Sequence, residues 1–279
     1  MSKPKQLPMR SKYLSAFAAA ACLGTILAGS AAAGEVLDKI KASGKIVYCS
    51  DLSVPPFIYL DPKTVQATGF DADIGIAVAK AMGLEAQYKN IGFDGLIPAL
   101  QAGQCDAILS ALFDKPARRE VVDFVDYANV GNAVIVKADS PLSIARLVDL
   151  SGKRVAVERG SVNEQEVVEA SDELVKQGKP KISVVSLPKA TDAIQQLLTG
   201  LVDAFYGGTA TEADYNKQNP GALKLASPQT STFYTGIATI KKDADVHEAL
   251  DAAFKKTQAD GSYDAVVKKW SFESMAMKP

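Results

Sequence analysis

Apolar residues along this chain follow patterns typical of helices and of buried strands. From Phe93 to Leu100 the apolar residues are spaced i, i+3, i+4 and i+7, which places them on one face of a helix. Gly103 then ends the helix, and an apolar run over 106–110 predicts a short buried strand. A helix followed by a buried strand is a unit of an α/β fold.

The same alternation on both sides of this segment predicts mostly parallel sheets with helices on both faces. Strands near 134–137 and 234–239 would cross between two lobes, and a cleft between lobes is a common ligand position. We expect a first lobe of residues 34–136 plus 234–279 and a second lobe of residues 137–233. The other expected strands cover 46–50, 86–90, 154–157, 182–185 and 204–206, and the expected helices cover 73–82, 163–176, 189–198 and 246–258.

The first 33 residues have the composition of a secretory signal peptide. Basic residues come before an apolar, alanine-rich run from Tyr13 to Leu27, and 31–33 gives a small-residue cleavage site. A retained membrane anchor is the alternative, but the run is short for a membrane span. We therefore expect cleavage before Gly34 and a periplasmic protein. The segment has four basic residues and no acidic one, so its loss changes the formal net charge from −1 to −5.

Charge and side-chain chemistry exclude several classes of function. A mildly acidic chain has no electrostatic surface for nucleic acid. His247 is the only histidine and lies among acidic residues, and the sequence has neither a Ser-His-Asp set nor a metal-ligand cluster. We therefore expect no enzyme, no cofactor and no metal site.

Two cysteines remain after the expected cleavage. In an exported chain such a pair favours a disulfide. Cys49 ends one expected strand, however, and Cys105 comes just before another. If these strands are parallel neighbours, the two residues lie at opposite ends, beyond the roughly 7 Å between Cα atoms that a disulfide allows. We expect two free thiols.

Five segments of the chain form an ordered set of motifs: 69–74, 92–110 with Arg118, 121–124 and Tyr127, 150–161, 200–204 and 260–270. In this order they resemble the periplasmic solute-binding proteins of polar amino-acid ABC importers, known as bacterial extracellular solute-binding proteins of family 3. The resemblance implies a two-lobe periplasmic-binding-protein fold. It also implies a monomer that captures an amino acid or amino-acid derivative between the lobes and delivers it to a membrane permease.

The resemblance also implies a site at the carboxyl ends of the strands, where ligands bind open α/β sheets. Arg118 matches the family's carboxylate-binding arginine, and its planar guanidinium suits a carboxylate. Phe93 matches an aromatic residue that covers the ligand. Backbone N–H groups after Gly160, at the start of a helix, favour an anion. The expected ligand-binding residues are Asp51, Phe57, Phe93, Ser110, Leu112, Arg118, Glu158, Ser161, Val162 and Gly208.

Each of these residues also has a purely structural interpretation. Arg118 fits a solvated surface run, the two phenylalanines fit the core, and Ser161 fits an ordinary helix N-cap. Glu158 fits a solvent-facing acid that pairs with Arg154 or Arg159.

Two departures from the family pattern bear on the ligand. The family usually has an aspartate for the ligand's α-ammonium where this chain has Gly208, and an apolar contact where it has Glu158. We expect Glu158 to take over the nitrogen contact, with room at Gly208 for a substituent on that nitrogen. Phe113 and Lys115 also replace small hydroxyl residues. The alternative function is a cyclohexadienyl-dehydratase-like enzyme on the same scaffold, with Glu158 or Lys115 as the acid.

Overall fold

A nine-stranded sheet runs through residues 35–277, the part of the chain that the computed structural model describes. The expected signal peptide, residues 1–33, lies outside it. The strand order is β5-β1-β6-β12-β7-β10-β8-β9, with β11 beside β7. The strands are β1 (Lys45–Ser50), β5 (Glu85–Asn90), β6 (Ala107–Ile108), β7 (Val122–Lys137), β8 (Arg154–Glu158), β9 (Ser183–Leu187), β10 (Ala204–Gly208), β11 (Leu223–Leu225) and β12 (Ser231–Ile240).

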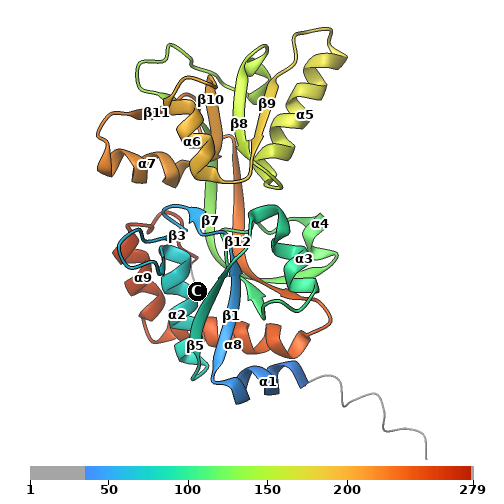
Figure 1. Cartoon of the computed structure of the whole chain (residues 1–279), viewed down its shortest axis with the longest axis vertical. Helices are drawn as coiled ribbons and strands as arrows, with labels where there is room; N and C mark the ends of the chain where they lie inside the picture. Colours follow the sequence, from blue (N-terminus) through green and yellow to red (C-terminus); the bar gives the residue numbers. More distant parts are fainter. Residues whose placement is uncertain (1–34, 278–279) are drawn as a thin grey trace, which may run out of the picture. The chain divides into compact units, whose positions relative to one another are not determined.

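The sheet is parallel towards both ends and antiparallel in the middle. β1 pairs in parallel with β5 and β6, and β8 does so with β9 and β10. β7 and β12 run side by side and antiparallel through the centre (Figure 1). These two strands contain the segments expected as strands near 134–137 and 234–239, but β7 begins well before residue 134. A second sheet has three short strands, β2 (Ser53–Val54), β3 (Ile58–Leu60) and β4 (Ala67–Thr68).

Helices bury apolar faces against both surfaces of the main sheet. On β8, Val155 and Val157 join the core cluster of α5, while Ala156 joins that of α6. This is the alternation expected of a strand buried on both faces. The helices are α1 (Glu35–Ser43), α2 (Phe70–Ala81), α3 (Leu96–Gln101), α4 (Pro116–Arg119), α5 (Val162–Lys176), α6 (Ala190–Leu198), α7 (Thr209–Gln218), α8 (Ala244–Ala259) and α9 (Ser262–Trp270), with 3-10 turns at Phe93–Gly95 and Leu147–Leu150.

Sequence patterning located most of these elements, but it did not predict α1, α4, α9, β11 or the three-stranded sheet. Three further differences have a physical reason. The helix expected from Phe93 begins as a 3-10 turn and becomes α-helical only at Leu96. The strand expected over 106–110 is only two residues long, because the chain turns out of the sheet and Ala111 adopts a left-handed conformation with φ 47°. The third difference is α7, which we did not predict because its sequence lacks a continuous apolar face.

The prediction of two free thiols was wrong. Cys49 and Cys105 form a disulfide, with their Cα atoms 5.6 Å apart. The prediction treated the chain before Asp106 as extended. Instead, residues 103–106 form turns and bends, and this curvature brings Cys105 beside Cys49.

Candidate functional site

The carboxyl ends of β1, β6, β8 and β10 supply loops to one cavity. Ligands bind at this end of the strands in open α/β sheets because the loops that leave the sheet converge there. The cavity has a volume of about 50 Å³. It is lined by Val54, Phe57, Phe93, Ala111, Phe113, Arg118, Val130, Glu158, Ser161, Val162, Asn163, Ala190, Phe205, Tyr206, Gly207, Gly208 and Thr211.

Arg118 extends from α4 into the wall of this cavity. Its Nη1 donates to the Phe113 carbonyl at 2.9 Å and its Nη2 to the Gly160 carbonyl at 3.3 Å. Among the described residues it forms no ion pair with an acid. Desolvation lowers the pKa of Arg118 to about 10, so the group stays cationic at neutral pH. A desolvated cation held only by carbonyls is suited to an anion.

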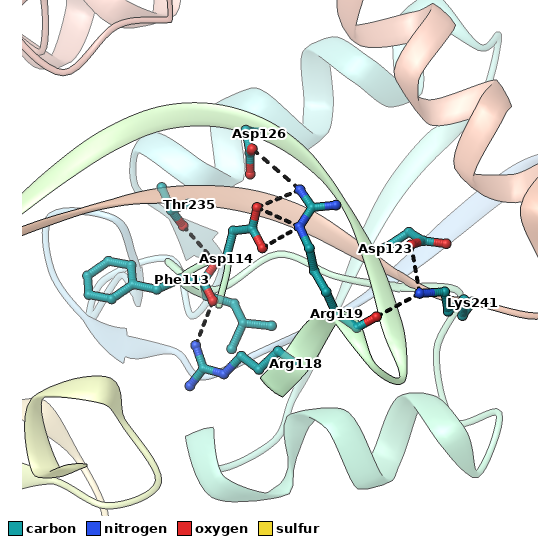
Figure 2. Close-up of polar contacts among 9 residues, drawn as sticks. Phe113, Asp114, Arg118, Arg119, Asp123, Asp126, Thr235 and Lys241 are labelled. Carbon is teal, nitrogen blue, oxygen red and sulfur yellow. Dashed lines mark hydrogen bonds and ion pairs between the residues drawn. The ribbon is translucent and has the colours of Figure 1, made fainter. Parts of the chain in front are cut away.

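The neighbouring Arg119 has the opposite environment. Its guanidinium binds both carboxylate oxygens of Asp114, and one of these bonds is 2.7 Å long. Figure 2 shows the Arg118 side chain directed towards the Phe113 carbonyl and the Arg119 side chain towards Asp114 and Asp126. Arg119 therefore already has its anionic partners, whereas Arg118 does not.

The N-terminus of α5 lies across the cavity from Phe113. Ser161 caps the helix, because its Oγ accepts the Glu164 N–H at 3.1 Å. Val162 and Asn163 follow it in the cavity wall. The Asn163 side-chain amide nitrogen is buried without a hydrogen-bond partner among the described residues. A helix N-terminus with such an amide beside it favours an anion, since both present N–H donors.

The motif at residues 69–74 fixes two parts of the wall. The Asp71 backbone N–H donates to the Phe57 carbonyl at 2.7 Å. Its carboxylate accepts the Ala111 N–H at 2.6 Å, which supports the left-handed conformation of Ala111. Gly69 has φ 128°, and a Cβ there would overlap the Phe57 carbonyl. The motif therefore holds Phe57 and Ala111 in the cavity wall but does not line the cavity itself.

Three of the expected ligand-binding residues lie behind the wall. Asp51 is buried, accepts the Phe93 N–H at 2.9 Å and receives the Ser53 hydroxyl. The Ser110 Oγ accepts the Asp51 N–H at 2.8 Å, and Leu112 is fully buried. Asp51 thus holds Phe93 in the cavity wall, and Ser110 holds Asp51.

Glu158 ends β8 with its carboxyl group in the cavity wall. The residue is 8% exposed, and its Oε1 accepts the Ala190 N–H at 3.2 Å. Burial, together with the nearby Asp51 and Asp94 carboxylates, raises the pKa of Glu158 to about 8. Glu158 is therefore not the solvent-facing acid of the structural interpretation. Arg154 and Arg159 pair instead with Asp203 and Asp94.

Gly208 leaves space between apolar groups. A Cβ built there would meet Thr211 Oγ1 and Val130 Cγ1 at 3.8 Å and Phe57 Cε2 at 4.0 Å, all ordinary contact distances. Phe93 lies nearby on the Arg118 side, with the guanidinium carbon 5.8 Å from the centre of its ring. The structure thus brings seven expected residues to one cavity: Phe57, Phe93, Arg118, Glu158, Ser161, Val162 and Gly208.

Sequence reasoning missed other lining residues. Asn163 gave a usable signal, because a polar side chain in the first turn of a helix after Gly-Ser is placed to reach an anion. Phe113 was noted only as a departure from the family pattern. Phe205 and Tyr206 fit a buried strand equally well, so nothing in the sequence marked them for the cavity.

Close contacts join the two sides of the cavity. The Gly160 backbone approaches Asp94 so closely that a Cβ there would lie 2.9 Å from the Asp94 Cα. Arg159 and Asp94 form an ion pair at 3.9 Å, and the Thr211 hydroxyl donates to the Pro55 carbonyl at 3.4 Å.

Residues 35–277 contain no group of three or more His, Cys, Asp or Glu side chains placed to hold a metal ion. None of the helices there is long and apolar enough to cross a membrane.

Comparison with known proteins decides the family. The family model for bacterial extracellular solute-binding proteins, family 3, matches residues 46–274. The chain belongs to this family. ABC transporter arginine-binding protein 1 of Escherichia coli is 29% identical to this family 3 protein, over 82% of this chain and 91% of the relative. The predicted family and transport class are therefore confirmed.

Solved structures confirm the fold class of this family 3 protein. An ancestral arginine-binding protein bound to arginine has a TM-score of 0.75 and 33% identity, over 81% of this chain and 98% of that one. The ancestral amino acid-binding protein AncCDT-1, a precursor of cyclohexadienyl dehydratase, has a TM-score of 0.70 and 30% identity, over 84% and 98%.

Proposed function

We propose that this protein is the periplasmic substrate-binding component of an ABC importer and that it captures an amino acid or amino-acid derivative. The proposal rests on the environment of Arg118. This residue is a desolvated cation in a cavity wall, bonded only to carbonyls, and a ligand carboxylate supplies the anion it lacks. The N-terminus of α5 and the Asn163 amide hold the same carboxylate from the other side.

Other residues of the cavity wall contact the remaining parts of such a ligand. Glu158 binds the cationic nitrogen, and Phe57 and Phe93 cover the carbon skeleton. The protein acts as a monomer that presents the closed, liganded form to a membrane permease. The Cys49–Cys105 disulfide fits an oxidising compartment such as the periplasm.

Arg118→Ala tests the proposal. Loss of one partner of a desolvated charged pair costs about 2–5 kcal/mol, so affinity should fall roughly 30-fold to several-thousand-fold. Isothermal titration calorimetry measures this with the ligand recovered from the purified protein. Arg119→Ala is the matched control, because its guanidinium is bonded to Asp114, and it should keep wild-type affinity. Wild-type affinity in Arg118→Ala would refute the carboxylate assignment.

A second candidate function is the dehydratase activity expected as the alternative. Glu158 favours it, because a carboxyl with a pKa of about 8 is protonated at neutral pH and can act as a general acid. Lys115 is a weaker acid candidate, since its Nζ lies 4.4 Å from the Phe233 ring centre and outside the cavity lining. Release of phenylpyruvate from prephenate by wild type but not by Glu158→Gln would establish this activity.

A further inference from the structure

Two charged side chains line the cavity. Of the described residues there, only Arg118 and Glu158 can carry a charge, and no ion pair joins them. The rest of the wall is aromatic, aliphatic or uncharged polar. A second cation or a second anion on a ligand would therefore be desolvated without a partner, which is unfavourable.

Two other acids lie near Glu158, and within residues 35–277 no cation forms an ion pair with it. Asp51, after β1, and Asp94, in the 3-10 turn, both disfavour its ionised form. The cations nearby act on those acids instead: Lys189, before α6, acts on Asp51, and Arg159 pairs with Asp94 at 3.9 Å. Besides the Ala190 N–H, the described residues provide Glu158 with no hydrogen-bond donor.

We propose that the cavity selects a zwitterion with one carboxylate and one cationic nitrogen, and that this nitrogen displaces a proton from Glu158 as it binds. The inference rests on the proposed function. In the ligand-free protein the buried carboxyl holds a proton. When the ligand enters, its nitrogen keeps its charge, the proton leaves to solvent, and the carboxylate pairs with the nitrogen. The raised pKa of Glu158, about 8, agrees with this exchange.

The same cavity argues against the ligand named for the relatives. L-Arginine carries a second cation in its side chain, and the wall offers no second acid to receive it. The space at Gly208 is bordered by a Val130 methyl group, the Phe57 ring and the Thr211 hydroxyl, so carbon atoms can contact the first two. L-Proline is an example of a suitable ligand. Its nitrogen is a secondary amine with one positive charge, and its ring carbons would occupy the space at Gly208.

The test is a calorimetric titration with four probes: L-proline, L-alanine, L-arginine and L-glutamate. We expect L-proline or L-alanine to bind at least tenfold more tightly than the two probes with an extra charge. Between pH 6 and 8 the affinity should rise about tenfold per pH unit, because only the ionised Glu158 pairs with the nitrogen. Glu158→Gln should remove this slope. Glu169→Gln, the same change on the exposed face of α5, should keep it.

Other outcomes overturn the inference. Tightest binding of L-arginine or L-glutamate refutes the ligand class, and pH-independent binding refutes proton release, as does a slope that persists in Glu158→Gln. If none of the four probes binds, other zwitterions of this class replace them. If only a carboxylate outside this class then binds, in an Arg118-dependent manner, the ligand class is wrong and the proposed function stands. If no carboxylate binds, the proposed function itself fails.

Discussion

Arg118 and Glu158 both lack a partner of opposite charge in the described part of the chain. Each is bonded only to the backbone: Arg118 to two carbonyls and Glu158 to one N–H. Desolvated groups without such partners destabilise the folded state. Binding sites commonly carry this cost, because the partner that satisfies the group is the ligand.

Glu158→Gln should therefore stabilise the ligand-free protein at high pH. Folding raises the pKa of this carboxyl from 4.5 to about 8, so between these values the folded state binds more protons than the unfolded state. Stability then falls as pH rises through this window, and Asp71, with a pKa raised to about 7, contributes in the same direction. Glutamine does not titrate. Between pH 5 and pH 8 the free energy of unfolding should therefore fall on the order of 2 kcal/mol less in the variant than in wild type.

Thermal denaturation followed by circular dichroism at pH 5 and pH 8 measures this difference. Glu169→Gln is again the control and should follow wild type, since this residue lies on the exposed face of α5. A variant that loses as much stability as wild type between the two pH values would contradict the prediction.

The sequence carried information about individual site residues only where chemistry and position coincide. Arg118 was expected at the site because it matches the family's carboxylate-binding arginine, and it does line the cavity; its position alone fits a surface run as well. Glu158 could be predicted from strand alternation, which placed it at the end of β8. Phe205 and Tyr206 could not, because their place in the cavity depends on which loops converge.

At the scale of elements, the loop between β8 and α5 governs how closely the two sides of the cavity meet. Gly160 has φ 75°, and its backbone packs against Asp94. Only a residue without a Cβ allows this approach. The carbonyl of the same residue accepts a hydrogen bond from Arg118, so the loop contacts both Arg118 and Asp94, and we expect it to limit closure.

Gly160→Ala should weaken ligand binding. Its Cβ would lie 2.9 Å from the Asp94 Cα, and such overpacking costs about 1–3 kcal/mol, or roughly 5- to 150-fold in affinity. Gly178→Ala is the matched control, since Gly178 has φ 69° with no atom within 4 Å of the added Cβ. It carries the same backbone strain without the contact. Calorimetry that shows equal affinities for the two variants would mean that Gly160 does not limit closure.

Periodicity predicted whole elements well because each buries one apolar face. The expected helices at 163–176 and 189–198 correspond closely to α5 and α6. Periodicity could not predict two features of the fold. The turn that brings Cys105 to Cys49 has no periodic signature, and α7 has no apolar face to detect.

At the scale of the whole molecule, β7 and β12 are the crossovers that we expect to act as a hinge, as the predicted lobes of residues 34–136 plus 234–279 and 137–233 require. Ligand selects the closed form because both sides contact it only there. The radius of gyration measured by small-angle scattering should decrease when ligand saturates the protein. Arg118→Ala, given the same ligand concentration, should show no change. A constant radius with a ligand that calorimetry shows to bind would indicate a rigid scaffold.

The position of β12 in the sheet also constrains when this protein folds. Although it comes late in the chain, β12 lies between β6 and β7. As the chain is synthesised from its N-terminus, β1, β5 and β6 appear early but have no neighbour on the β6 side until residues 231–240 follow. The sheet is therefore completed only near the end of synthesis, and until then β6 and β7 expose unpaired edges that must be kept from aggregation.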